Sequence, residues 1–425
     1  MGQQALRQLL QMQDDHQCTA IALSVWMDGT PCNWDRSQSL ETICFGFPGL
    51  GGANSSLRIP ITVINKKHCV KWQTMDSILA VVAWSMQCMG AGFWPSKNHL
   101  GEAFGPQERQ RTGMANTSLG YRAFLVEVKG DWALLADVFR FPSWRSKDGC
   151  CWLCNVKPST LHDFSSTAPW RQTENRLSHW QVLSGILAKG QQVSPLFSSP
   201  GVTAQTFAID WMHCGDLGVS ADYLGNLFYH ITGGRADACA ELYLKIRSYY
   251  QKQPCTSKLD TLTPSMLRKN GKTSPKLRGK AAEIRYLVPF GAELAQEVFT
   301  DPSDSVGVTI RQAAQHLASA YSCLQRDVFN PQMLKESSTR FLLLCNSLAS
   351  MFGPALWRIK PKHHLFAELC SMGCNPSMSW NYREEDFGGS MAAMSRRRGG
   401  VFSAGTAAQN VLNKFRAQHP LKLRT

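Results

Sequence analysis

The sequence has little that would place the chain in a membrane or direct it to secretion. Its most apolar stretch, residues 77–94, is interrupted by Ser85 and Gln87 and lacks flanking clusters of Lys and Arg. We therefore expect a buried core helix there and no membrane span. The opening segment MGQQALRQLLQMQDDHQ has neither the apolar run nor the cleavage site of a secretory signal. Its 15 cysteines, an odd number, are accordingly expected to be reduced thiols.

Acidic residues are scarce relative to basic ones. The 425 residues include 31 Asp and Glu against 45 Lys and Arg, which gives a formal net charge of +14. This balance favours an acidic partner, and nucleic acid is the commonest one. The sequence also lacks internal repeats and low-complexity tails, and its 44% hydrophobic content predicts a globular chain of two or three domains.

The first part of the chain has the patterns of an α/β protein. Three successive antiparallel strands are predicted from TAIALSVWMD (19–28), SQSLETICFGFPG (37–49) and LRIPITVIN (57–65). The apolar stretch 74–92 predicts a helix, and LGYRAFLVEVKGD (119–131) predicts a fourth strand. The resulting order is β-β-β-α-β, with Asp28 and Asp131 each at the end of a strand.

The rest of the chain is predicted to interrupt this α/β core and then return to it. Residues 140–205 are rich in proline and loops, and apolar residues three and four apart indicate helices from about 216 to 352. We expect an N-terminal helical lead (1–18), the first part of the core (19–165), a loop-rich and helical insertion (166–354) and a C-terminal return to the core (355–425).

Carboxylates at the ends of the first and fourth strands are what a ribonuclease H-like fold requires, because those two strands are neighbours in its sheet. The segment WNYREEDFGG (380–389) supplies a third acid, Glu385, from the C-terminal part. Three carboxylates suit two hard cations such as Mg²⁺ or Mn²⁺, which activate a water or a 3′-hydroxyl for attack on a phosphodiester. The predicted catalytic and metal-binding set is Asp28, Asp131 and Glu385.

Each of these acids also has an ordinary structural interpretation. Asp28 precedes a glycine, and Asp-Gly is a favoured hairpin turn. Asp131 would cap a helix that starts at Trp132, and Glu385 is one of three consecutive acids with Glu384 and Asp386. The shared topology, and no single residue, favours the catalytic interpretation.

A second kind of metal site is suggested by cysteine spacing. Cys151-x-x-Cys154 within CCWLCN has the spacing of half a zinc site. His363 and His364 are the candidate partners, with Cys370, Cys374 and the nearby His162 as further options. The alternative is a pair of buried thiols that bind no metal.

An acid and an imidazole also occur three residues apart, as Asp210 and His213 in AIDWMHCGDLGV. On one helical turn they can form a hydrogen bond or approach one metal. A capping aspartate next to a core histidine would have the same spacing, so the motif by itself predicts only an accessory pair.

Two basic segments fit contacts with a nucleic-acid backbone, although such runs are usually solvated surface. They are RKNGKTSPKLRGK (268–280) and the SRRR that follows the acidic segment. The candidate DNA-binding residues are Arg268, Lys269, Lys272, Lys276, Arg278, Lys280, Arg396, Arg397 and Arg398.

Taken together, these motifs resemble a known family over residues 20–415. MDGTP, VKGDWALLADVF, CCWLCN, AIDWMHCGDLGV, PKLRGKAAEIRYLVPF, IKPKHHLFAELC and NPSMSWNYREEDFGGS are similar to transposase-derived proteins of the CACTA and Kyakuja-Dileera-Zisupton groups. The block Asp210-Trp-Met-His213 resembles the D-x-M-H motif of that superfamily, and Trp380 to Gly389 resembles the block that carries its final acid.

The resemblance implies a DDE transposase that cuts transposon ends and joins them to target DNA with Mg²⁺ or Mn²⁺. It implies Asp28, Asp131 and Glu385 as the catalytic acids. Asp210 is the alternative to Asp131 as the second acid. Glu384 and Asp386 are the alternatives to Glu385 as the third. In the related V(D)J recombinase a CxxC after the second acid joins histidines shortly before the last acid around zinc. The resemblance therefore implies zinc held by Cys151, Cys154, His363 and His364, which occur in the same order. A nuclear location is expected from the DNA substrate alone, and a second copy of the chain is a further candidate partner.

One departure from the family is that Asp28 lies too near Met1 to leave room for an upstream DNA-binding module. We therefore expect a fragment, a degenerate copy or a domesticated core. The alternative functions are a catalytically inactive DNA-binding or protein-binding descendant and a zinc-stabilised scaffold.

Overall fold

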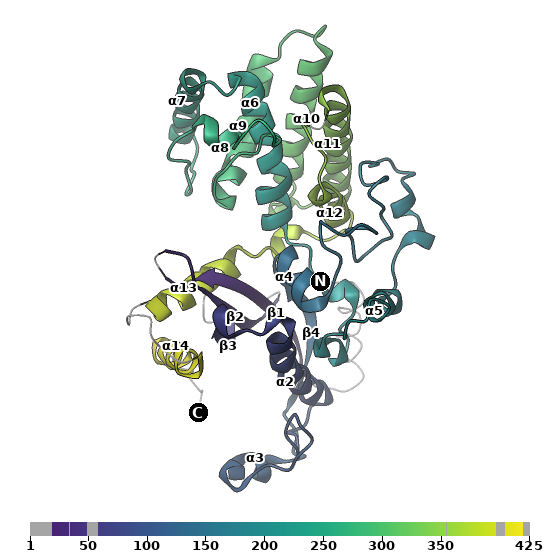
Figure 1. The fold of residues 1–425 in the computed structure, drawn as a ribbon, viewed down its shortest axis with the longest axis vertical. Helices are drawn as coiled ribbons and strands as arrows, with labels where there is room; N and C mark the ends of the chain where they lie inside the picture. The colour runs from purple at the N-terminus through teal and green to yellow at the C-terminus, as the bar shows by residue number, and fades with distance from the viewer. Residues whose placement is uncertain (1–18, 34, 49–57, 354, 397–403, 420–425) are drawn as a thin grey trace. The chain divides into compact units, whose positions relative to one another are not determined.

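The computed structural model describes residues 19–33, 35–48, 58–353, 355–396 and 404–419 (Figure 1). The chain divides into two compact units, each assembled from separate segments. Unit 1 comprises Met1–Ser143, Leu177–Ala208 and Asn381–Thr425, and unit 2 comprises Trp144–Arg176 and Ile209–Trp380. The predicted helical lead, residues 1–18, lies outside the described residues.

Unit 1 is built on a four-stranded mixed sheet with the order β3-β2-β1-β4. β1 (Thr19–Pro31) pairs antiparallel with β2 (Ser39–Gly46), and β2 pairs antiparallel with β3 (Arg58–Asn65). β4 (Tyr121–Lys129) pairs parallel with β1, as expected when a helix precedes it in a crossover. The four strands lie where the sequence predicts them, so the mixed α/β class is confirmed.

Helices pack on this sheet through their apolar residues. The crossover helix α2 (Lys71–Ala91) packs against β4 and buries Met75, Leu79, Val82 and Met86, as expected for a core helix. α13 (Tyr382–Arg396) packs against β1, and α14 (Ala404–Gln418) packs against β3 (Figure 1). The other α-helices described in unit 1 are α3 (Arg109–Met114), α4 (Trp132–Phe139) and α5 (His179–Leu187).

One core cluster in unit 1 joins the start of the chain to its end. The Trp26 side chain of β1 is 1% exposed and belongs to the same cluster as Phe387 and Met391 of α13. A Cβ atom on Gly388 would lie 2.8 Å from Cη2 of Trp26 and 2.9 Å from Oγ1 of Thr30. Only glycine allows so close an approach of α13 to β1.

Unit 2 is mostly helical, as predicted for the region after residue 216. Its second segment, Ile209–Trp380, opens with a π-helix at Met212–Ser220. α6 packs closely at Gly225, because a Cβ atom there would lie 2.3 Å from the backbone nitrogen of Leu277. Its α-helices are α6 (Ala221–Thr232), α7 (Ala236–Lys252), α8 (Pro264–Leu267), α9 (Ala281–Val298), α10 (Ser305–Ser322), α11 (Pro331–Phe352) and α12 (Pro361–Cys370).

None of the helices within the described ranges combines the length and the apolar content needed to cross a bilayer.

Candidate metal centres

Asp28 and Asp131 approach one pocket from neighbouring parallel strands. The register pairs Trp26 of β1 with Lys129 of β4. Asp28 and Asp131, each two residues further along, therefore lie at the same end of the sheet. Both line a pocket of about 250 Å³, together with Glu41 and Asp137. The tertiary structure thus brings together two of the three predicted catalytic acids.

The pocket carries more negative than positive charge. Four carboxylates line it, against the ammonium groups of Lys66 and Lys71. Glu41 is the most buried of the four acids, and its Oε1 lies 3.5 Å from Nζ of Lys66. Burial raises the pKa of Glu41; the Lys66 ammonium opposes this effect, and the charges of Asp131 and Asp137 add to it. Such a group of oxygen ligands suits a hard cation.

The local hydrogen bonds decide between the structural interpretations of the two aspartates. Asp28 is not in a hairpin turn, because β1 continues to Pro31 and Gly29 pairs with Glu41 across the sheet. Its Oδ1 accepts a hydrogen bond from the Gly29 amide at 2.7 Å. Asp131 does cap a helix, since the Leu134 amide donates to its Oδ1 at 2.6 Å at the start of α4. Capping and metal binding are compatible, because a carboxylate has two oxygens.

The third acid comes from α13. Alternate residues of a strand share a face, so Asp28 lies on the face of β1 that carries Trp26 and Thr30, which is where Gly388 of α13 packs. Glu385 lies just before Gly388 on that helix and is half-buried, but it does not line the pocket of Asp28 and Asp131. Packing therefore brings α13 to the sheet face of Asp28 and leaves Glu385 outside the pocket.

Glu384, the neighbour of Glu385, has a structural role. Its Oε1 lies 2.9 Å from Nη2 of Arg58 and 3.4 Å from Nζ of Lys129, and all three side chains are buried. Removing the carboxylate would leave two buried cations without this partner. Asp386 is exposed and, like Glu385, does not line the pocket of Asp28 and Asp131.

We expect Glu41→Gln to raise the free energy of unfolding of the metal-free protein at pH 7 by about 0.5–2 kcal/mol, the common gain from a single stabilising substitution. The glutamine amide is neutral, so the variant avoids the cost of burying a negative charge, which is the cause of the raised pKa of Glu41. Because the folded pKa is raised, the penalty is complete above that pKa and absent below the ordinary value of 4.5. Urea denaturation of the variant and the unaltered chain at pH 7 and at pH 4 measures the difference in free energy of unfolding with and without this penalty.

The gain from Glu41→Gln should therefore disappear at pH 4. An equal gain at both pH values would show that packing, and not the carboxylate charge, causes the change.

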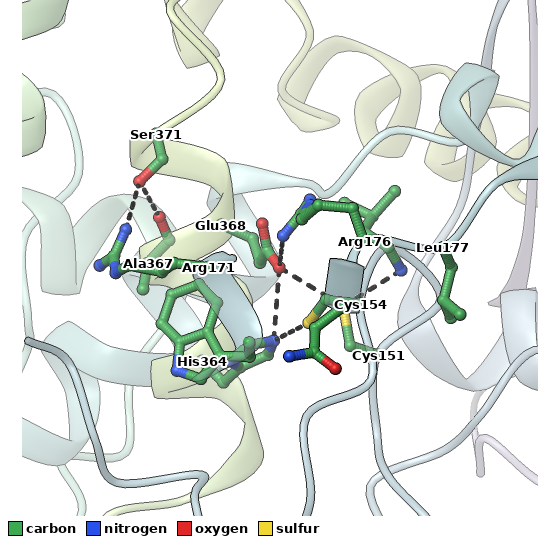
Figure 2. Close-up of polar contacts among 12 residues, drawn as sticks. Cys151, Cys154, Arg171, Arg176, Leu177, His364, Ala367, Glu368 and Ser371 are labelled. Atoms are coloured by element: carbon green, nitrogen blue, oxygen red, sulfur yellow. Dashed lines mark hydrogen bonds and ion pairs between the residues drawn. The ribbon is translucent and has the colours of Figure 1, made fainter. Parts of the chain in front are cut away.

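A second group of possible metal ligands lies within unit 2. Figure 2 shows Cys151, Cys154, His364 and Glu368 converging, and one ligand atom from each lies within 4.8 Å of all the others. Cys154 Sγ is 3.3 Å from Nε2 of His364, which is 3.6 Å from Oε1 of Glu368. All four residues are buried. Two sulfurs, one imidazole and one carboxylate are a donor set that zinc accepts.

Helix geometry explains why Glu368 belongs to this group and His363 does not. His364 and Glu368 are four residues apart on α12 and so share a face of that helix. His363 points elsewhere, and its Nδ1 accepts a hydrogen bond from the Lys360 amide at 3.1 Å. Burial lowers the pKa of His363 to about 4. The other predicted options, Cys370, Cys374 and His162, are also outside the group.

Neighbouring side chains hold the four residues in place. Nη1 of Arg176 lies 2.6 Å from Oε1 of Glu368 (Figure 2). The Trp170 ring meets the His364 ring edge-on, with centroids 4.6 Å apart. A hydrogen bond with Cys151 and burial both raise the pKa of the Cys154 thiol. A bound cation would oppose both effects, because a coordinating thiol is deprotonated.

Asp210 and His213 form the predicted pair, in unit 2. Oδ2 of Asp210 lies 2.7 Å from Nδ1 of His213, and Asp210 also accepts hydrogen bonds from the amides of Met212 and His213 at the start of the π-helix. Asp210 thus caps this helix and orients the imidazole. A π-helix often marks a functional position, and this one begins at Met212, within the segment 210–213.

The basic segment 268–280 contains both structural and exposed side chains. Arg268 donates to the carbonyl of Thr273 at 2.7 Å and lies over the Tyr229 ring, and Lys276 donates to the carbonyl of Leu217 at 2.7 Å. These two cations are therefore used within unit 2. Lys269, Lys272, Arg278 and Lys280 are exposed. Arg397 and Arg398 lie outside the described residues, and Arg396 is described only as the end of α13.

A comparison with models of known protein families finds no match, and a comparison with curated proteins finds no significant relative.

Proposed function

We propose that this chain is the catalytic core of a DDE-type transposase, which cleaves DNA at transposon ends and transfers the strand with the help of divalent cations. The observation that carries the proposal is the approach of Asp28 and Asp131, 103 positions apart in sequence, to one acidic pocket. The strand order β3-β2-β1-β4 with a parallel β1–β4 pair is also what a ribonuclease H-like core would have.

Asp28 and Asp131 would hold Mg²⁺ or Mn²⁺ at the end of the sheet, and Glu385 of α13 would complete the ligand set. Bound cations would activate a water or a 3′-hydroxyl and neutralise the charge that develops on the phosphate. Lys66 and Lys71, which also line the pocket, would hold the phosphodiester by its charge. The exposed Lys269, Lys272, Arg278 and Lys280 are the proposed DNA contacts in unit 2, and a nuclear location would follow from such a substrate.

We assign the group of Cys151, Cys154, His364 and Glu368 a structural Zn²⁺. It uses four protein ligands, which is typical of a structural and not a catalytic zinc site. Arg176 would orient Glu368 from outside the ligand shell, as conserved outer partners do in other metal sites.

Incubation of the full chain with supercoiled plasmid and Mn²⁺ should convert the plasmid to nicked circles, and EDTA should prevent this conversion. We expect Asp28→Asn to reduce the nicking rate at least about 100-fold, since cation binding supplies several kcal/mol of transition-state stabilisation. Gel electrophoresis of the plasmid over time gives the rate.

Asp35→Asn is the matched control, because Asp35 is an exposed acid just after β1, and it should nick like the unaltered chain. Absence of nicking by the unaltered chain, with DNA affinity equal in the Asp28→Asn variant, would favour a binding protein without catalysis.

A further inference from the structure

Unit 2 contains a pocket of about 650 Å³ with an excess of positive charge. One helical face of α11, the Pro169–Arg171 turn and the end of α12 line it. Its charged lining residues are Arg171, Arg176, Lys335, Arg340, Glu336 and Glu368. No catalytic acid of unit 1 belongs to this pocket, so what binds there is independent of the proposed cleavage chemistry.

Arg171 presents hydrogen-bond donors that the described residues do not satisfy. Its guanidinium lies 4.3 Å from the Trp170 ring centroid, and Nη1 donates to Oγ of Ser371 at 3.3 Å. Its Nε and Nη2 are buried and have no hydrogen-bond partner within the described part of the chain. A buried donor without an acceptor destabilises the protein, because it has lost its hydrogen bonds with water. The arrangement thus favours a ligand that brings oxygen acceptors.

The two acids that line the pocket do not balance its four cations. Glu368 forms an ion pair with Arg176 at 2.6 Å, so the charges of these two residues cancel. Glu368 also belongs to the group of Cys151, Cys154 and His364. Lys335 and Arg340 are exposed and form no ion pair with any acid in the described ranges. Glu336 alone remains against Arg171, Lys335 and Arg340.

We propose that this pocket binds a phosphate group. The planar guanidinium groups of Arg171 and Arg340 match the paired oxygens of a phosphate, and Lys335 adds a point charge. The volume exceeds that of a single phosphate ion, so the group can belong to a nucleic-acid backbone or to a free phosphate or nucleotide. Trp170 holds Arg171 by a cation–π contact and so orients its donors before a ligand arrives.

The test uses the double variant Lys335→Gln, Arg340→Gln of the full chain, because both side chains are exposed and their loss should leave the fold intact. A fluorescent 20-base-pair DNA duplex is one probe, followed by anisotropy, and inorganic phosphate is the other, followed by the shift in melting temperature. We expect binding of at least one probe to weaken at least about tenfold, since the variant loses two charged donors to the phosphate oxygens.

The control is Arg235→Gln, Lys252→Gln, which removes the same charge from exposed positions outside the pocket. If the loss of affinity is confined to the duplex, the ligand is a nucleic-acid phosphate, and the slope of log affinity against log salt should also fall by about two. If it is confined to inorganic phosphate, the ligand is a free phosphate. Equal affinities of the two double variants for both probes, or no binding of either probe by the unaltered chain, would overturn the proposal.

Arg171→Lys tests the buried donors separately. It keeps the positive charge but loses the planar pair of donors. We expect it to weaken binding of the same probe that the Lys335→Gln, Arg340→Gln variant binds less tightly. Its metal content should equal that of the unaltered chain. Unchanged affinity would show that Arg171 does not contact the ligand and would contradict its assigned role.

Discussion

Asp131→Asn is expected to reduce Mn²⁺-dependent plasmid nicking at least about 100-fold while the melting temperature stays the same. Asp131 has two roles, since it caps α4 through the Leu134 amide and lines the acidic pocket. Asparagine is as good a helix cap as aspartate, but it brings no negative charge to a cation. The substitution therefore separates the two roles. Nicking rates and thermal denaturation of the same preparations measure both.

Asp131→Ala is the companion variant. It should lose the same activity and, in addition, about 1 kcal/mol of stability, because the cap is lost as well. Full activity of Asp131→Asn would mean that this residue only caps α4. Asp210, the competing second acid, would then be tested by Asp210→Asn.

The double variant Cys151→Ser, Cys154→Ser should lose one equivalent of zinc per chain and several kcal/mol of stability. Structural zinc contributes roughly 10–16 kcal/mol of binding free energy in small zinc-dependent domains. Here the ligands come from the loop at 151–154 and from α12, so the metal would tie two distant segments of unit 2 together. Metal analysis by mass spectrometry and thermal denaturation with and without a chelator measure the two effects.

Cys150→Ser is the matched control for the zinc prediction. Cys150 is buried next to the group, and burial raises its pKa to about 12, but it is not among the four converging residues. His364→Gln should lose the metal, whereas His363→Gln should keep it. If the double cysteine variant retains a full equivalent of zinc, these thiols are core residues without a metal.

Much of unit 1 could be predicted from local patterns. Strands appear at all four predicted positions, because alternation and β-branched residues depend on near neighbours in sequence. The helix before the fourth strand also implies a parallel crossover, which places β4 beside a strand of the same direction. These two features predict that Asp28 and Asp131 lie toward the same end of the sheet, and the β1–β4 register brings both to one pocket.

The remaining site residues could not be found in this way. Glu41 lines the pocket because the β1–β2 register pairs it with Gly29, and nothing in its local sequence indicates that register. Glu368 could have been considered, since it lies four residues after His364 on an apolar helix. Its choice over the adjacent His363 depends on which face of α12 meets the cysteine loop, and packing decides that.

For the basic residues, too, the sequence indicates charge but not which side chains are free to bind a ligand. Runs of Lys and Arg indicate a charged surface, yet Arg268 and Lys276 donate to backbone carbonyls of their own unit. Arg171, Lys335 and Arg340 stand in no basic run and line one pocket only after the loop, α11 and α12 have packed.

The sequence by itself determined the strands of unit 1 and the crossover helix, because these depend on interactions between residues close in the chain. Asp28 was predicted at the end of its strand, but β1 continues to Pro31, so this acid lies within the strand near its end. Only the tertiary structure decided which side chains share a pocket. Strand register and the rotation of each helix about its axis arise from contacts between distant segments, and no local pattern encodes them.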